Sequence, residues 1–130
     1  MSVPRFWRKQ TNRYNLIGTK CETCGTYYFP PRTLCPKCRR EGKIVDYKFK
    51  GTGKIVTFSV VRTASDKFDL QTPFVVAIIE LDEGTRLTAP VICSDINEVY
   101  IGMRVKSTFR KISADGDSGI IVYGTKFIRE

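Results

Sequence analysis

From residue 44 to the C-terminus, apolar and polar side chains alternate in the pattern of β-strands. Val56, Phe58 and Val60 are spaced by two residues and would share one face of a strand, because successive side chains of a strand point to opposite faces. Gly51-Thr52-Gly53 lies just before them and predicts a bulge or a sharp bend. The pattern therefore predicts a sheet in this part of the chain.

A nearly continuous apolar run at residues 74–81 predicts a strand that is central in its sheet or covered on both faces. A polar loop is expected before it, at residues 64–72. Asp82-Glu83-Gly84 predicts a tight turn, so the apolar strand should form a hairpin with residues 85–93. We interpret Cys93 as a buried core residue, because it ends an apolar stretch and the chain has no histidine to activate its thiol.

The clearest alternation begins at Met103. Met103, Val105 and Phe109 should point inward, while the side chains between them are polar or basic and should point outward. The outward residues are Arg104, Lys106, Thr108 and Arg110. A turn is expected at residues 113–119 and a closing strand at residues 120–128.

Five or six short strands with one bend are expected to close into a small barrel. The OB-fold fits this size best, and an SH3-like barrel or a small sandwich is the alternative. We therefore predict a mainly β chain in two domains. Residues 1–43 carry an N-terminal helix and a rubredoxin-like zinc ribbon, residues 44–130 form a C-terminal OB-fold barrel, and Glu41-Gly42-Lys43 links them.

The N-terminus has the periodicity of an amphipathic helix, at about residues 4–14. Its cations share one face and its aromatic residues share the other. The two faces are Arg5, Arg8, Lys9 and Arg13, and Phe6, Trp7, Gln10 and Tyr14. Either the aromatic face docks the helix onto the rest of the protein while the cations are solvated, or the helix binds phosphate or a partner.

Two CxxC pairs separated by ten residues predict a metal site. The pairs are Cys21 and Cys24, and Cys35 and Cys38. Each pair can form a tight knuckle that directs both sulfurs at one ion, and four thiolates give the tetrahedron that zinc prefers. Gly25 supports this, because the residue after a knuckle often needs a positive φ. Arg39 occupies the equivalent place in the second knuckle, so that turn must be built differently or be strained.

Four protein ligands leave no open coordination position, so the zinc would be structural and would not activate water. It would stabilise a ribbon that is too small to fold on a core of its own. Iron in a rubredoxin-like redox site is an alternative, since four thiolates also hold iron. Two disulfides are the other alternative.

Composition narrows the classes of function. The 130 residues carry a formal net charge of +9, which favours an acidic partner such as nucleic acid, a phosphorylated cofactor or an acidic protein surface. The absence of histidine removes the commonest general base and argues against catalysis by this chain alone. No apolar run could cross a membrane and no signal peptide is apparent, so we expect a cytoplasmic location.

The ordered set of motifs resembles the acyl-CoA-associated zinc-ribbon OB-fold family, long known as a domain of unknown function. The resemblance covers essentially the whole chain. It rests on the aromatic and basic helix, both CxxC pairs, Phe29-Pro30-Pro31-Arg32, and the motifs at residues 73–84 and 101–105.

The resemblance implies a non-catalytic partner of thiolase-like condensing enzymes. In archaea such proteins are associated with acetoacetyl-CoA thiolase and hydroxymethylglutaryl-CoA synthase of the mevalonate pathway. They link these enzymes and help to enclose the coenzyme A moiety. The expected partners are therefore a thiolase, a hydroxymethylglutaryl-CoA synthase, and coenzyme A or acyl-CoA, whose phosphates suit the positive charge of this chain.

We place the expected ligand and partner surface on the helix and the ribbon. Its residues are Arg5, Trp7, Arg8, Arg13 and Arg32. The arginines would bind phosphates or carboxylates, and the indole would stack on an adenine ring or a partner side chain. The two prolines before Arg32 stiffen its segment and would project it outward.

The alternative function is the binding of single-stranded nucleic acid, since OB-folds and zinc ribbons both serve it. Three cations on one strand face could follow a phosphate backbone: Arg104, Lys106 and Arg110. Against this, Phe58, Phe74 and Phe109 fall at expected core positions, so no exposed aromatic residues are expected among those cations. A redox ribbon is a third class.

Overall fold

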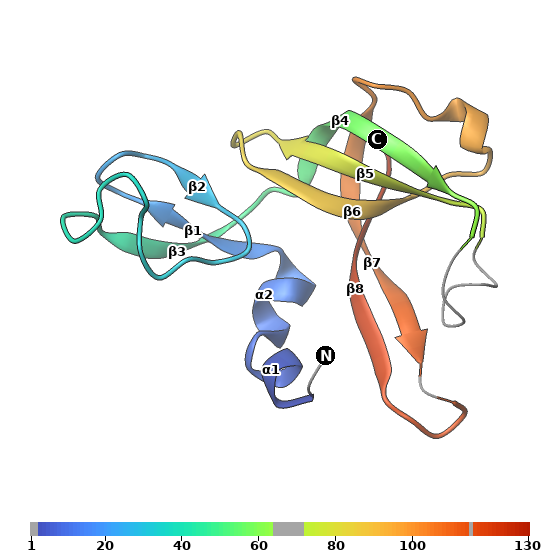
Figure 1. Cartoon of the computed structure of the whole chain (residues 1–130), viewed down its shortest axis with the longest axis horizontal. Coiled ribbons are helices and arrows are strands. Elements are labelled where there is room, and N and C mark those ends of the chain that lie inside the picture. Colours follow the sequence, from blue (N-terminus) through green and yellow to red (C-terminus); the bar gives the residue numbers. More distant parts are fainter. Residues whose placement is uncertain (1–2, 64–71, 115) are drawn as a thin grey trace.

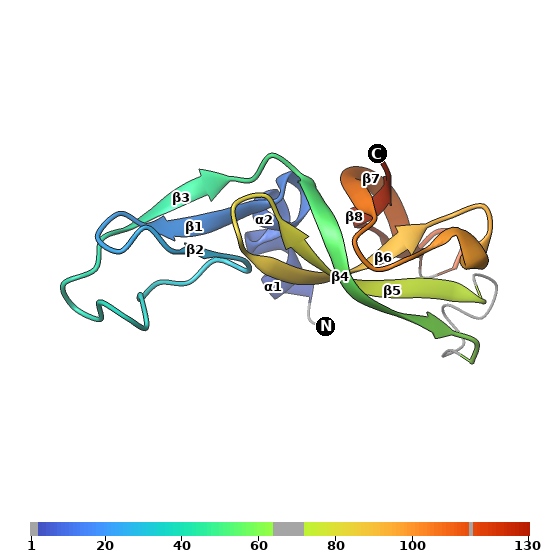
Figure 2. The ribbon, with the colours of Figure 1, turned by 90° about the horizontal axis from the view of Figure 1, so that it is seen from above.

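A computed structural model of the chain describes residues 3–63, 72–114 and 116–130. A three-stranded ribbon and a five-stranded barrel lie side by side, with two short helices next to both (Figures 1 and 2). The ribbon part contains α1 Val3–Arg8, α2 Gln10–Asn15, β1 Ile17–Cys21, β2 Tyr27–Tyr28 and β3 Ile44–Lys48. The barrel part contains β4 Thr52–Val61, β5 Phe74–Leu81, β6 Arg86–Ile92, the 3-10 helix η2 Ile96–Glu98, β7 Arg104–Ala114 and β8 Ile121–Arg129. Most of the polar loop expected at residues 64–72 lies outside the described residues.

The N-terminal helix forms as predicted but is interrupted at Lys9, which separates α1 from α2. Trp7 is 70% exposed, so the interpretation that it docks the helix onto the body is wrong. Tyr14 makes such a contact instead, with its ring centroid 5.1 Å from that of Phe109. Among the aromatic side chains of the helix that the structure describes, it is thus Tyr14, in the C-terminal half, that contacts the barrel strands.

The ribbon sheet has the strand order β2-β1-β3, and both pairs are antiparallel. We expected the strands after residue 43 to belong to the barrel, but β3 pairs with β1 along its whole length, from Ile17 opposite Lys48 to Cys21 opposite Ile44. The ribbon sheet thus extends beyond residue 43, and the division into two domains there stays a prediction.

The segment 41–43 is packed into the ribbon and is not a free linker as we expected. A Cβ on Gly42 would lie 2.9 Å from the Cβ of Cys38. The backbone N–H of Glu22 donates to the carbonyl of Lys43 at 2.9 Å. The chain actually crosses to the barrel after β3.

The barrel is closed in the order β4-β5-β6-β8-β7. Its neighbours are antiparallel except for β6 and β8, which pair in parallel. This arrangement confirms the predicted OB-fold, and β5 is central as expected. We had predicted a bulge or bend at Gly51-Thr52-Gly53. The register of β4 shifts instead between Ile55 and Thr57, so the bulge lies after these glycines. Gly53 instead marks close strand packing, because a Cβ there would lie 2.5 Å from the carbonyl oxygen of Glu80.

The barrel core confirms the inward positions of Met103 and Val105. All five strands contribute to it, with mainly aliphatic side chains from β4, β5, β6 and β7 and the ring of Phe127 from β8. Phe109 was expected there and is 51% exposed instead. β4 pairs with β7 only as far as Lys106, so the outer parts of β7 and β8 extend past the barrel (Figure 1), and Phe109 lies beyond the part of β7 that a described strand of the barrel core flanks on its other side.

Phe49 joins the ribbon to this core. It is buried in one cluster with Leu16 and the barrel residues, and its ring lies between the ribbon and the barrel. Three ribbon aromatics contact it, with centroids at 5.3–6.2 Å: Tyr27, Phe29 and Tyr47. Its backbone N–H donates to the carbonyl of Leu16 at 3.1 Å. The two parts of the molecule therefore share a continuous apolar core.

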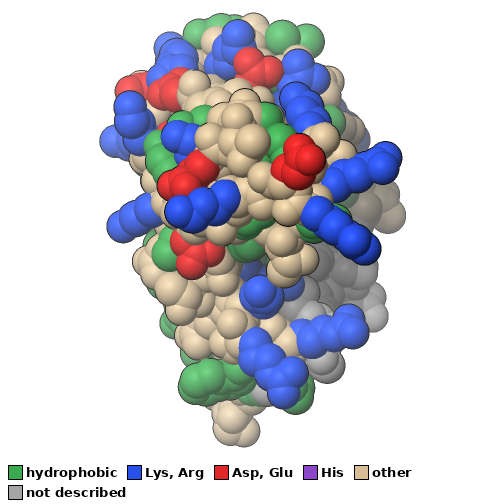
Figure 3. All heavy atoms as spheres, turned by 90° about the vertical axis from the view of Figure 1, so that its left-hand side faces the viewer, with side chains coloured by type: hydrophobic (Ala, Val, Ile, Leu, Met, Phe, Trp, Pro, Cys, Tyr) green, Lys and Arg blue, Asp and Glu red, His purple; other side chains and the backbone are tan. Residues whose placement is uncertain are grey.

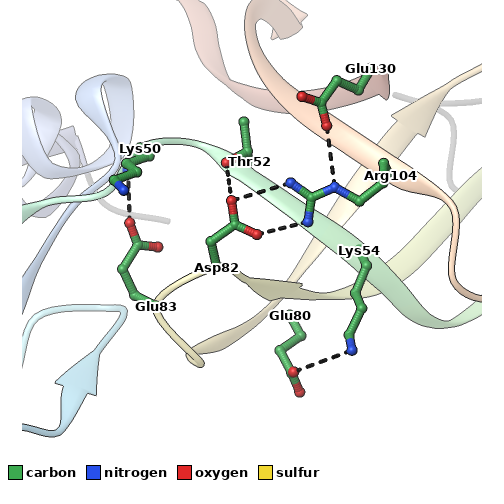
Figure 4. Close-up of polar contacts among 8 residues, drawn as sticks. All are labelled: Lys50, Thr52, Lys54, Glu80, Asp82, Glu83, Arg104 and Glu130. Atoms are coloured by element: carbon green, nitrogen blue, oxygen red, sulfur yellow. Dashed lines mark hydrogen bonds and ion pairs between the residues drawn. The ribbon is translucent and has the colours of Figure 1, made fainter.

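The β5–β6 turn is joined to β4 and β7 by hydrogen bonds and ion pairs of its side chains (Figure 4). Arg104 donates to both carboxylate oxygens of Asp82, at 2.7 and 3.2 Å, and also to Glu130 at 3.3 Å. The hydroxyl of Thr52 donates to Asp82 as well. These bonds, first from Arg104 and then from Thr52, lower the pKa of Asp82 to about 2.

We expect Asp82→Asn to destabilise the protein above about pH 4 by roughly 0.5–1 kcal/mol, since the carboxylate is partly exposed. The pKa of Asp82 is lower in the folded state than the ordinary value of about 3.9. Its contribution is therefore present above that ordinary value and is lost as the pH falls through about 2. The measurement is the difference in free energy of unfolding between variant and wild type at pH 7, 5, 4, 3 and 2. Asp46→Asn is the matched control, and a difference that stays constant down to pH 2 would contradict the prediction.

Candidate functional site

The two CxxC knuckles have the same backbone geometry. The N–H of Gly25 donates to the carbonyl of Cys21 at 2.8 Å, and the N–H of Arg39 donates to that of Cys35 at 2.8 Å. Both turns need a left-handed residue, with φ of 73° at Gly25 and 52° at Arg39. Glycine adopts this conformation freely, whereas an arginine there costs on the order of 1 kcal/mol. Of the two alternatives expected for the second turn, a different construction or strain, the structure thus shows the strained one, with Arg39 at a positive φ.

The knuckles bring four sulfur atoms together. The Sγ atoms of Cys21, Cys24, Cys35 and Cys38 all lie within 4.8 Å of one another. Those of Cys24 and Cys35 are 3.5 Å apart. Four thiolates around a tetrahedral zinc, with Zn–S bonds of about 2.3 Å, are about 3.8 Å apart, whereas a disulfide needs about 2.05 Å. All four cysteines are free, so the disulfide interpretation is wrong, and the four sulfurs could hold one ion.

The surroundings of the sulfurs favour a bound cation. The Tyr28 hydroxyl lies 3.4 Å from Cys35 Sγ, and this hydrogen bond lowers the pKa of the Cys35 thiol to about 6. The same contact raises the pKa of Tyr28 to about 12. Burial, and then the neighbouring thiols, raise the pKa of Cys38 to about 12. Ionising all four thiols at neutral pH therefore requires a positive charge among them, which a divalent metal supplies.

Cations surround this site at the ribbon end of the molecule. Figure 3 faces that end and shows Lys and Arg side chains spread over it, with fewer Asp and Glu. Arg32 is exposed, and its guanidinium lies 5.2 Å from the centre of the Tyr28 ring. Its backbone N–H donates to Thr19 Oγ1 at 3.1 Å, which fixes the segment. The ribbon thus presents Arg32 close to the metal site.

The other predicted binding residues lie on the helices. Arg5, Trp7 and Arg8 are on α1 and exposed, and Arg13 is on α2. Because α2 runs directly into β1 at Leu16, the predicted binding residues on the helices and Arg32 on the ribbon belong to one continuous stretch of chain. Whether these residues bind a ligand stays a prediction.

A cavity of about 660 Å³ lies between the barrel and the outer parts of β7 and β8. It was not predicted from the sequence. It is lined mainly by Phe74, Val75, Pro90, Val91, Ile96 and Ile112. Cys93 also lines it and is half-buried rather than buried, although it packs against the core as expected. Burial raises the pKa of this thiol, so it stays protonated at neutral pH. Residues from β5, β6 and β7 meet here, and no local pattern in the sequence marks such a cavity.

None of the described helices is long and apolar enough to cross a membrane.

Two family models match the chain, and they correspond to the two parts of the fold. Residues 8–43 match the rubredoxin-like zinc ribbon domain of ChsH2. Residues 47–110 match the C-terminal OB-fold domain of ChsH2. The zinc-ribbon match, together with the four neighbouring sulfurs, confirms the prediction of a structural zinc.

Relatives of known name match over nearly the whole chain. A DUF35 domain-containing scaffold protein of Methanocaldococcus jannaschii is 50% identical over 125 residues, which cover 96% of this chain and 89% of that protein. One of Methanothermobacter thermautotrophicus, with the same name, is 46% identical and covers 95% of this chain and 92% of that protein. The solved structure of the Ltp2-ChsH2(DUF35) aldolase has a matching chain with a TM-score of 0.71 and 27% identity, covering 95% of this chain and 90% of that one.

We expect Cys35→Ser to abolish stoichiometric zinc binding and to loosen the ribbon while the barrel stays folded, because most residues of the shared core lie on the barrel strands. The measurements are zinc content by elemental analysis and amide exchange of β1 compared with β5. Cys93→Ser is the matched control, since it removes a thiol outside the cluster and should leave one zinc per chain. Full zinc retention in Cys35→Ser, or iron with visible thiolate bands in the wild type, would contradict the assignment.

Proposed function

Because the chain belongs to the DUF35 family of ChsH2-type zinc-ribbon and OB-fold proteins, we propose that it is a non-catalytic scaffold that binds a catalytic enzyme. The main support is the identity of 50% to a scaffold protein, spread over 96% of this chain. Identity of this extent covers ribbon and barrel alike, so both parts of this chain have counterparts in that protein. A cytoplasmic location is part of this proposal.

The chemistry of the candidate site supports a structural role. We propose that Cys21, Cys24, Cys35 and Cys38 are the zinc ligands. Among the residues that the structure describes, this is the metal-competent cluster, and its four ligands leave no position for water or substrate. The chain also has no histidine. A scaffold needs neither an open metal position nor a general base.

The more specific proposal concerns the partners. We propose that the enzyme is a thiolase, a hydroxymethylglutaryl-CoA synthase or both. We also propose that coenzyme A or acyl-CoA binds to the surface formed by α1 and the ribbon. The net charge of +9 suits a ligand with three phosphate groups. Exposed cations on α1 and on the ribbon, with the exposed indole of Trp7, provide a surface for it.

Nucleic-acid binding, the alternative function, is less well supported than the scaffold function. It was based on the face of β7 that carries Arg104, Lys106 and Arg110. Arg104 was expected to contact phosphates, but its guanidinium is bound to Asp82 and Glu130 (Figure 4). Two carboxylates beside one guanidinium cancel its attraction for a phosphate backbone. Lys106 and Arg110 would then have to act without it.

We expect the double variant Arg8→Ala/Arg32→Ala to bind acyl-CoA or the partner enzyme at least about a hundredfold more weakly, because each of the two charge-assisted contacts contributes about 1.5–3 kcal/mol. Calorimetric titration measures the affinity, and thermal unfolding shows whether the fold is intact. The matched control is Lys54→Ala/Lys106→Ala, which removes two exposed barrel cations and changes the net charge equally. Equal weakening by both double variants would indicate a general charge effect and contradict this surface.

We expect the purified zinc-loaded protein to show no thiolase, synthase or thioesterase turnover, since it has no histidine and no open metal position. Adding the partner enzyme should produce or change activity. The assays use acetyl-CoA and acetoacetyl-CoA at each purification step. An activity that follows this chain alone through purification would contradict the proposal.

A further inference from the structure

The outer parts of β7 and β8 form a two-stranded hairpin that projects from the barrel (Figure 1). From Thr108 opposite Lys126 to Ala114 opposite Ile121, these strands pair only with each other. A two-stranded hairpin on its own is marginally stable in water. Contacts on at least one of its faces are therefore needed to keep it ordered.

One face of this hairpin is apolar and only partly covered. We call it the hairpin face and define it by Phe109, Lys111, Ile121, Tyr123 and Thr125. Phe109 lies opposite Thr125 and Lys111 opposite Tyr123, while Ile121 shares the face through the two-residue period of a strand. The rings of Phe109 and Tyr123 stack with centroids 5.3 Å apart and an angle of 12° between their planes.

Helix α2 covers the part of the hairpin face nearest the barrel. Tyr14 meets the Phe109 ring edge-on at 5.1 Å, and Thr125 Oγ1 donates to the carbonyl of Arg13 at 3.1 Å. The rest is open, since Phe109 is 51% and Ile121 45% exposed, and the neighbouring Ile120 is 51% exposed. Large apolar side chains grouped like this on a projecting element are typical of an interaction surface.

Basic residues surround this apolar area. The described residues of α1, Lys9 and α2, together with the hairpin face itself, include five cations, namely Arg5, Arg8, Lys9, Arg13 and Lys111. Arg110 and Lys126 lie on the opposite face of the hairpin. The turn at the tip of the hairpin contains one described carboxylate, Asp117. A partner that covers the hairpin face should therefore carry carboxylates around an apolar centre.

We propose that the hairpin face is the docking surface for the partner enzyme, which meets it with an apolar area bordered by Asp and Glu side chains. This inference rests on the proposed scaffold function and specifies where the enzyme binds. A second copy of this chain is a poor occupant, because an isologous contact would place the same cations opposite one another. A single-stranded nucleic acid fits less well, since Phe109 and Tyr123 already stack on each other and isoleucines offer no ring to a base.

The test uses the full-length zinc-loaded protein and the condensing enzyme that co-purifies with it, identified by mass spectrometry. Lys111→Glu should weaken binding by at least about tenfold, because it places a carboxylate against the carboxylates of the partner. Lys106→Glu is the matched control, since it makes the same charge change on the same strand but outside the hairpin face; it should change the affinity less than about twofold. Phe109→Ser/Ile121→Ser should also abolish tight binding, but it removes the contact of Phe109 with Tyr14 as well. Ile121→Ser alone leaves that contact in place and should weaken binding while the melting temperature and zinc content stay near those of the wild type, because Ile121 is 45% exposed.

The outcomes separate this inference from the scaffold function. If the wild type captures the enzyme and the Lys111→Glu variant binds it as tightly as the Lys106→Glu variant does, the hairpin proposal fails and the scaffold function stands. If the wild type captures no condensing enzyme, both fail. If a single-stranded oligonucleotide binds the wild type and Phe109→Ser/Ile121→Ser removes that binding, the hairpin face recognises nucleic acid and the proposal is overturned.

Discussion

The burial of Phe49 between the ribbon and the barrel is the contact on which the arrangement of the molecule depends. The ribbon has two short antiparallel strand pairs and a metal site, which are too few contacts to fix its position. Its aromatic residues are covered because they pack around a ring that also belongs to the barrel core. Gly18 allows this close approach, since a Cβ there would lie 2.5 Å from the Phe49 ring. Turning the ribbon relative to the barrel would expose this ring to water, at a cost of about 2–3 kcal/mol for the ring alone.

Stability and surface chemistry are located in different parts of the chain. The metal site and the barrel core are closed, and they use their polar groups internally. Even the turn at Asp82 and Glu83 uses its carboxylates within the fold: Asp82 binds Arg104, and Glu83 accepts from the backbone of Lys50 (Figure 4). Glu83 also accepts from the hydroxyl of Tyr47. Both carboxylates of this turn are thereby bound to groups of the protein itself. The basic residues of the helices and the hairpin are left in excess, and this excess gives the surface its positive character.

The sequence predicted the features that depend on local spacing. The cysteine spacing predicted the metal cluster, the apolar run predicted β5, and the turn after it predicted β6. The two-residue alternation predicted β7 and the inward positions of Met103 and Val105. The predictions from the sequence failed where the position of a strand or side chain depends on which strands pair. β3 has the alternation of a barrel strand but pairs with β1. Phe109 continues the inward pattern of β7, yet the barrel ends before it. The indole of Trp7 could not be placed either, because a helical pattern does not reveal whether a neighbour covers its apolar face.

The ribbon enters and leaves the rest of the fold at almost the same point. Leu16 precedes β1, Phe49 follows β3, and a backbone hydrogen bond of 3.1 Å joins them. Residues 17–48 therefore form an insertion, and both of its ends are held together by the core. Changing the length of a loop closed in this way costs little entropy, and insertions are tolerated at such positions. Ribbons of different length, or from different relatives, could thus be exchanged on one barrel as long as Leu16, Gly18 and Phe49 are kept, so that a single barrel could be paired with different metal modules.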